Sequence, residues 1–261
     1  MTEYRGGMEI QRQKALEAIN AHNKNMYYEA DAENFKKISG TPIAYWVSNQ
    51  LLKIFQEASP LSDRFTPREG ITTGKNEKYL RLWFEISLNK FYQFSKKEAK
   101  WFPHSKGGPF RKWYGNNEYV LNWKNNGEDL RNELLSNSDI TPVLRNTTYF
   151  FRDAITWTSI SSGSFAARFR KNQYTFDTKG PSGFCEDEST YLEVIAFLDS
   201  KVVNSLMKIL APTLDFKISK VCNLPFMMTD IYKDKIHHLA KLNIFIAKND
   251  WDVPLQYACL R

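Results

Sequence analysis

The residues of this sequence that are best suited to chemistry are cations and flat aromatic rings, gathered between Arg64 and Lys124. This segment holds 13 Lys or Arg and 5 Asp or Glu, which leaves 23 of the chain's 36 basic and 24 of its 29 acidic residues elsewhere. The segment therefore accounts for the whole net charge of +7, and it also contains four of the seven tryptophans. Because Lys and Arg neutralise phosphates and aromatic rings stack on bases, the pattern favours nucleic-acid binding over a merely solvated basic surface.

Two glycine-containing stretches, 70–83 and 106–115, supply most of the individual candidates. Lysines are expected to hold phosphates, and arginines and asparagines to reach base edges. Gly107 and Gly108 are expected to let the backbone approach a phosphate, although a plain tight turn before Pro109 is the competing interpretation. Any of these residues could instead be an ordinary surface charge or a core ring. The phosphate candidates are Lys75, Lys78, Lys106, Lys112 and Lys179, and the other candidates are Arg81, Arg111, Arg168, Asn76, Asn116, Asn117 and Trp113.

Several other kinds of site lack a signal in the sequence. Cys185, Cys222 and Cys259 are odd in number and widely spaced, and the adjacent His237 and His238 would point about 100° apart on a helix. We therefore expect no metal. The 70–83 stretch matches neither the GxGxxG pattern nor a Walker loop. No run of about 18 apolar residues and no signal-peptide core is present, so we expect a cytoplasmic chain without a membrane partner.

Hydrophobic periodicity predicts a mixture of helices and short strands. Helices are expected from Ile10 to Ile19, from Thr41 to about Ser59, and over 128–135, 191–210 and 230–247. The 41–59 helix should bury a stripe of Ile43, Val47, Leu51 and Ile54 or Phe55. The alternation in 79–86 predicts a half-buried strand with Leu80, Leu82, Phe84 and Ile86 inward. Further short strands are expected over 119–123, 156–160, 165–169 and 174–176, and a turn at Asn126-Gly127.

Longer motifs resemble one protein family. The runs Ser39–Ser48, Gly70–Trp83, Lys100–Gly115 and Gly180–Phe184, with Ile155–Ser162 and Asn223–Pro225, are similar to the large adenine-specific DNA methyltransferases of BREX phage-exclusion systems (the PglX type). The resemblance covers about residues 27–250 and extends to single-chain type IIG restriction–modification enzymes.

The resemblance implies the DNA target-recognition half of such an enzyme and not its catalytic half. Family members bind S-adenosylmethionine through a glycine-rich loop and hold the flipped adenine with an Asn-Pro-Pro-Tyr loop, and neither motif occurs in this sequence. Asn223-Leu-Pro-Phe226 has Leu224 at a proline position. We therefore expect no cofactor and no catalysis from this chain alone, and a longer parent protein that is a site-specific methyltransferase. The last residues, 253–261, depart from the family pattern, which is compatible with a truncation or a reading-frame change, and no expectation is based on them.

These observations predict an α+β fold, a target-recognition-domain-like twisted sheet of short, mostly antiparallel strands with flanking helices. The predicted organisation is a helical linker over 1–56, a DNA target-recognition domain over 57–226 and a helical segment over 227–261. Double-stranded DNA is the expected partner, together with other defence-system subunits. A stand-alone interaction module that docks on a defence complex is the alternative. A hydrolase is a weaker one, since no PD-(D/E)xK-like acidic cluster and no Ser/His/Asp arrangement is recognisable.

Overall fold

The computed structural model describes residues 7–22, 31, 33, 36–38, 47–94, 96–136 and 140–258, with the side chains of α9 described up to Asp252. The chain divides into two compact units, Met1–Glu57 and Ala58–Arg261. Among the described helices, none is both long and apolar enough to cross a membrane.

The first unit contains two described helices, α1 (Met8–Asn20) and α3 (Asn49–Glu57). Helix α1 was predicted, and α3 ends just before Ser59-Pro60 as expected. The predicted helix start at Thr41-Pro42 lies outside the described residues. Within α3 the buried side chain is Leu52, while Ile54 of the predicted stripe is 40% exposed. Leu51 and Phe55, the other predicted members of the stripe in this helix, are partly buried, so the predicted face is met in part.

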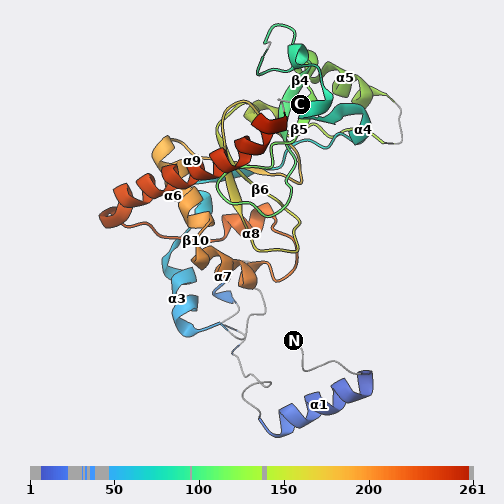
Figure 1. The fold of residues 1–261 in the computed structure, drawn as a ribbon. Helices are drawn as coiled ribbons and strands as arrows, with labels where there is room; N and C mark the ends of the chain where they lie inside the picture. Colours follow the sequence, from blue (N-terminus) through green and yellow to red (C-terminus); the bar gives the residue numbers. More distant parts are fainter. Residues whose placement is uncertain are drawn as a thin grey trace. The chain divides into compact units, whose positions relative to one another are not determined.

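The second unit is built on two four-stranded sheets (Figure 1). One sheet has the antiparallel order β2 (Thr66–Arg68), β9 (Ser182–Phe184), β6 (Ala154–Trp157), β7 (Ala167–Arg170). The other has the order β3 (Leu80–Leu82), β5 (Tyr119–Asn122), β4 (Trp101–Ser105), β8 (Thr175–Phe176), and only its β4–β8 pair is parallel. A short pair joins β1 (Ser59–Pro60) to β10 (Pro225–Phe226). The predicted class, α+β with short and mostly antiparallel strands, is confirmed at this level.

Aromatic rings fill the space between these strands. Trp123 and Phe176 both pack edge-on against Phe150, with ring centroids 5.0 and 5.2 Å away. Phe176 also lies beside Phe184 of the other sheet, and each of these four rings is at most 7% exposed. Burial of such large side chains dominates the hydrophobic stabilisation of a fold. The rings of the two sheets therefore form one continuous core.

The strand predicted over 79–86 is shorter than the alternation indicated. Tyr79 ends the one-turn helix α4 (Asn76–Tyr79), β3 covers only Leu80–Leu82, and a 3₁₀ turn spans Trp83–Glu85. The turn forms because the Glu85 carboxylate accepts the Leu82 backbone N–H at 2.7 Å. Phe84, expected to point inward, is 63% exposed.

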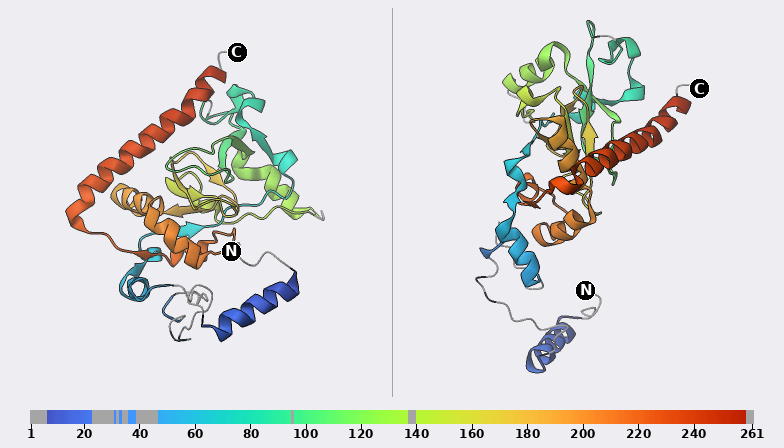
Figure 2. Two further views of the ribbon diagram at one scale, coloured as in Figure 1. Left: turned by 60° about the horizontal axis from the view of Figure 1, so that its bottom comes forward. Right: turned by 90° about the vertical axis from the view of Figure 1, so that its left-hand side faces the viewer.

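Two predicted helices also have different bounds. The stretch 191–210 is not continuous: α6 (Glu188–Leu198) and α7 (Lys201–Leu210) are separated by Asp199-Ser200. The Ser200 hydroxyl accepts the Val203 N–H and begins α7 as its N-cap. The last helix, α9, spans Lys233–Ala258 and continues well past the predicted end at Ala247. It packs against α6 and runs along one side of the second unit (Figure 2).

One local prediction agrees closely with the structure, and one short helix was missed. The predicted Asn-Gly turn is a left-handed run in which Asn125, Asn126 and Gly127 have φ of 47°, 60° and 75°, within α5 (Lys124–Leu135). Asparagine and glycine tolerate this region better than other residues. The short helix α8 (Ile218–Cys222), just before the predicted break at Asn223, was not predicted.

Candidate nucleic-acid interface

The connection from β4 to β5, residues 106–117, carries most of the predicted binding residues and is called here the 106–117 loop. It has no regular secondary structure. Its backbone is in the left-handed region at Gly107, Gly108, Trp113, Gly115 and Asn116, with φ between 59° and 140°. A loop with so many such residues needs specific contacts to hold it.

The two glycines at its start are required by the protein itself. A Cβ on Gly107 would lie 3.0 Å from the Lys179 carbonyl oxygen, and one on Gly108 would lie 2.8 Å from the Asn116 amide nitrogen. The Thr158 hydroxyl also donates to the Gly108 carbonyl at 2.9 Å. Close packing and positive φ thus account for both residues as a tight turn, the competing interpretation of the sequence. A phosphate contact at Gly108 stays a prediction.

Arg168 of β7 holds the loop from the protein interior. Its side chain is 2% exposed, and its guanidinium donates to the Arg111 carbonyl and to the Thr158 hydroxyl, each at 3.3 Å. Burial lowers the pKa of Arg168 to about 10. Asn116, 3% exposed, donates its amide to the Pro109 carbonyl at 2.9 Å. Neither side chain is accessible to a base edge in this structure. Both instead hold the backbone of the 106–117 loop through hydrogen bonds to its carbonyls.

Asp199, at the break between α6 and α7, is a second internal anchor. Its carboxylate accepts the backbone N–H groups of Ala167 at 2.9 Å and Trp113 at 3.1 Å. The Lys112 ammonium donates to the Asp199 carbonyl at 2.5 Å. Burial raises the pKa of Asp199 to about 7, against the opposing effect of these N–H groups and of nearby Lys112 and Arg168. The Trp113 backbone and the Lys112 side chain are therefore both held by Asp199.

Three cations remain at least partly exposed around this loop. Lys179 is exposed, and its backbone N–H donates to the Asp177 carboxylate. Lys106 lies over the Tyr119 ring, and partial burial lowers the pKa of its ammonium. Arg111 pairs with Asp250 at 3.1 Å and stacks over Trp251, with its side chain 40% exposed. These three side chains are the predicted phosphate and base contacts beside the loop that solvent reaches, although Lys78 of the Gly74 turn, 54% exposed, is more accessible than Arg111.

The cations of the Gly74 turn have a different environment. Lys75 and Lys78 each lie 2.5 Å from a carboxylate oxygen of Glu133 on α5. The Tyr79 hydroxyl donates to the same carboxylate at 3.1 Å. Hydrogen bonds from Lys75 and Lys78 lower the pKa of Glu133 to about 2. The two lysines thus share a counter-charge that the sequence did not reveal.

The remaining candidates near this turn make mostly local contacts. The Asn76 side-chain oxygen accepts from the Thr73 hydroxyl at 2.5 Å. Arg81 donates to the carbonyls of Glu77 and Leu80 and lies over the Trp101 ring. None of these contacts belongs to the 106–117 loop.

The segment 177–180 connects the two regions. Thr178 donates its hydroxyl to the Gly70 carbonyl at 3.1 Å, and Ile71 pairs with Asp177. A Cβ on Gly180 would lie 2.6 Å from the Gly107 nitrogen, so this segment also packs directly on the 106–117 loop. The structure therefore brings both glycine stretches to one segment, while their cations have different partners.

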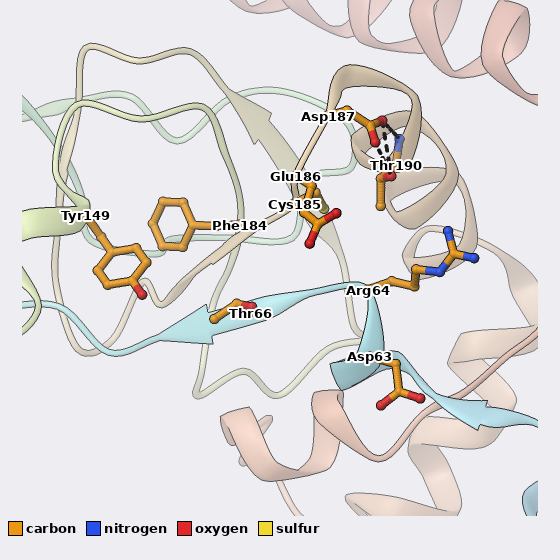
Figure 3. A pocket seen from close by; sticks show the side chains of 9 residues that line it. All are labelled: Asp63, Arg64, Thr66, Tyr149, Phe184, Cys185, Glu186, Asp187 and Thr190. Carbon is orange, nitrogen blue, oxygen red and sulfur yellow. Dashed lines mark hydrogen bonds between the residues drawn. The ribbon is translucent and has the colours of Figure 1, made fainter.

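A cavity of about 380 Å³ elsewhere in the second unit has the opposite charge (Figure 3). Its lining contains Asp63, Glu186 and Asp187 but only one cation, Arg64. Asp187 accepts the Thr190 N–H at 2.8 Å and caps α6. An excess of carboxylates repels phosphate, so this cavity does not fit a polyanion. Within the described residues, no group of three or more His, Cys, Asp and Glu is arranged to hold a metal ion.

Sequence reasoning missed Asp199, Thr158, Glu133 and Trp251. The sequence did contain a signal for Asp199, because Asp199-Ser200 inside an apolar helical pattern is a typical N-cap sequence. No local signal identifies Glu133, which lies 58 residues from Lys75 in the chain.

Comparison with known proteins finds two curated relatives that match most of this chain. The chain is 40% identical over 248 residues to the adenine-specific methyltransferase PglX of Lacticaseibacillus casei (strain Zhang), which is 92% of this chain and 20% of that protein. It is 35% identical over 231 residues to the adenine-specific methyltransferase BrxX of Escherichia coli O9:H4 (strain HS), which is 87% of this chain and 18% of that protein. No family model matches the chain. The chain thus spans about a fifth of the length of these relatives.

Proposed function

We propose that this chain is the DNA target-recognition part of a BREX-type adenine-specific DNA methyltransferase. The observation that carries the proposal is the similarity to two adenine-specific methyltransferases over about nine-tenths of the chain. The basic 106–117 loop, held rigidly by buried contacts, supports it, because a preorganised surface loses little entropy on binding.

Within this proposal the residues divide into three roles. Lys106 and Lys179 contact phosphates and set the orientation of the duplex. Arg111 exchanges its exposed ion pair with Asp250 for a guanine edge, and Asn117, which lines a cavity together with Trp251, offers an amide. Arg168, Asn116 and Asp199 keep the loop in the required shape from behind. Breaking the exposed Arg111–Asp250 ion pair costs little, since such pairs contribute about 0–1 kcal/mol to stability.

Methyl transfer belongs, in this proposal, to parts of the parent protein outside this sequence. S-adenosylmethionine sites of the family's type use a glycine-rich loop between a strand and a helix of a parallel sheet. In the second unit both four-stranded sheets are antiparallel apart from the β4–β8 pair, so the described residues do not fit such a site. Titration calorimetry should detect no binding of S-adenosylmethionine to this chain, and micromolar binding would contradict this assignment.

A salt titration of DNA binding tests the proposal. Fluorescence anisotropy with a duplex at several salt concentrations should give a steep linear loss of affinity. Lys179→Ala should reduce the slope of log K against log salt by about one, because one phosphate contact is removed. Lys208→Ala, an exposed lysine of α7, is the matched control and should leave the slope unchanged. Absence of duplex binding at low salt would contradict the proposal.

One observation favours the alternative, a docking module. Along α9 the side chains of Leu239, Leu242, Phe245 and Ile246 are 42–60% exposed. Exposed apolar groups close together on one helix are typical of a protein contact. Protein docking through α9 is compatible with DNA binding by the 106–117 loop, because α9 contacts this loop only through its last described turns.

A further inference from the structure

A cavity of about 640 Å³ lies beside the 106–117 loop and has an unusually aromatic lining. Pro103 of β4 and Val120 of β5, which are direct partners in the sheet, form part of it. Its volume is in the range of small-molecule sites, roughly 300–1,000 Å³. Rings from four separate parts of the second unit surround it: Trp83, Phe94, Tyr114, Tyr119, Tyr174 and Trp251.

Cations contact three of these rings. Lys106 lies 5.8 Å from the centroid of Tyr119, Lys248 5.6 Å from that of Tyr114, and Arg111 4.7 Å from that of Trp251. Purely hydrophobic protein contacts are depleted in lysine, whereas nucleic-acid sites combine stacking rings with cations for the backbone. The charge around this cavity therefore favours a ligand that has both a flat ring and a phosphate.

The polar groups in the lining are few and suited to a base edge. Asn117 and Gln93 contribute amides and Asp252 a carboxylate, and the Gln93 amide donates to Gln173 at 3.0 Å. An amide can donate to and accept from a base, and a carboxylate accepts from an exocyclic amino group. Asp252 is paired with Lys248, so its charge is partly compensated.

We infer that this aromatic cavity receives an unpaired nucleobase from a DNA strand that is held by the 106–117 loop. This inference rests on the proposed function, because the loop must first hold the strand. Tyr114 and Asn117 belong to both the loop and the cavity, so a base leaving the stack need not cross other protein to enter. Lys106 lies at the same junction through its contact with Tyr119.

Binding of three DNA probes tests the inference. They are a fully paired duplex, the same duplex with one unpaired extra base, and the corresponding single strand, measured by anisotropy at one salt concentration. The duplex with the extra base should bind about 5- to 100-fold more tightly than the paired one, the effect of stacking one base on aromatic side chains. Phe94→Ala and Trp83→Ala should each remove most of this preference and leave affinity for the paired duplex unchanged.

The variants are chosen so that misfolding does not obscure the result. Phe94 is 68% exposed, so its removal should not affect folding, which thermal unfolding would verify. Phe245→Ala is the matched control, because Phe245 is 60% exposed on α9 and does not line the cavity. It should keep the full preference.

The outcomes separate the inference from the proposed function. Binding of the paired duplex without any preference for the extra base, or a preference that both Phe94→Ala and Trp83→Ala retain, would overturn the inference and leave the proposed function in place. Binding of the single strand alone, weakened by Phe94→Ala, would support the cavity and contradict duplex recognition. No binding of any probe would overturn both.

Discussion

The Gly74 turn (residues 70–81) and the 106–117 loop each combine glycines with three cations, but these cations have different partners in the structure. At the Gly74 turn, Lys75 and Lys78 both pair with Glu133, whose side chain is 11% exposed. In the 106–117 loop, buried groups hold the backbone through Arg168 and Asp199. At the Gly74 turn the charges of the two lysines are compensated by a carboxylate. In the 106–117 loop it is the backbone that is held, and Lys179 beside the loop stays exposed.

This difference shows that local basic charge does not by itself identify a polyanion site. Lysines that already share a carboxylate must give up that attraction to bind a phosphate. A loop that is held from behind by buried polar groups can present cations without reorganising. On the proposed function we therefore expect DNA contact at the 106–117 loop, and four experiments can test this comparison.

Removal of the buried anchor should have the largest effect. Asp199→Ala leaves the buried Ala167 N–H without its acceptor and takes a carboxylate away from Arg168, so we expect a loss of about 2–4 kcal/mol in the free energy of unfolding. Glu133→Ala should cost less, because its partner Lys78 is exposed and both lysines can be solvated when the carboxylate is removed. Urea unfolding measures both. Equal losses for the two variants would contradict the distinction between the regions.

The two carboxylates should also respond to pH in opposite directions. The lowered pKa of Glu133 means that its contribution to stability is complete above about pH 4.5 and is lost as the pH falls towards 2. The raised pKa of Asp199 means that the folded state keeps a proton that the unfolded state releases, so stability falls as the pH rises from about 4 to 7. Urea midpoints across this range, for the parent and for Glu133→Gln and Asp199→Asn, should show that each variant lacks the corresponding trend.

Paired substitutions should separate the two regions in DNA binding. Lys106→Ala with Lys179→Ala should lower the salt slope by about two, since two phosphate contacts are removed. Lys75→Ala with Lys78→Ala should change it by less than about one, because Glu133 already compensates these charges. A larger change for the second pair would place the duplex at the Gly74 turn.

The smallest expected effect is an increase in DNA affinity. Glu133→Gln removes the negative charge shared by Lys75 and Lys78, so the local positive potential rises and attracts phosphates more strongly. We expect non-specific duplex affinity at low salt to rise by a few-fold, about what one additional uncompensated charge contributes. Anisotropy with a random-sequence duplex measures it. An unchanged affinity would indicate that the Gly74 turn lies away from DNA altogether.

Features that depend on neighbouring residues could be predicted from the sequence. The left-handed turn at Asn125–Gly127 follows from the tolerance of asparagine and glycine for positive φ, and β5 follows from the strand-forming residues Tyr119, Val120 and Leu121. The concentration of charge in 64–124 and the short-strand α+β class were recognisable for the same reason. The longer strand expected over 79–86 failed because one carboxylate, Glu85, stabilises a turn against the apolar alternation.

The sequence by itself determined where the cations are, and the tertiary structure decided which of them are accessible. Arg168 and Arg111 look equivalent in the sequence, but β7 places Arg168 inside the protein and the loop leaves Arg111 partly exposed. Lys75 meets its counter-charge 58 residues away, and Trp113 meets Asp199 at a separation of 86. Charge is a property of each residue, whereas burial and pairing arise only when the two sheets bring distant segments together.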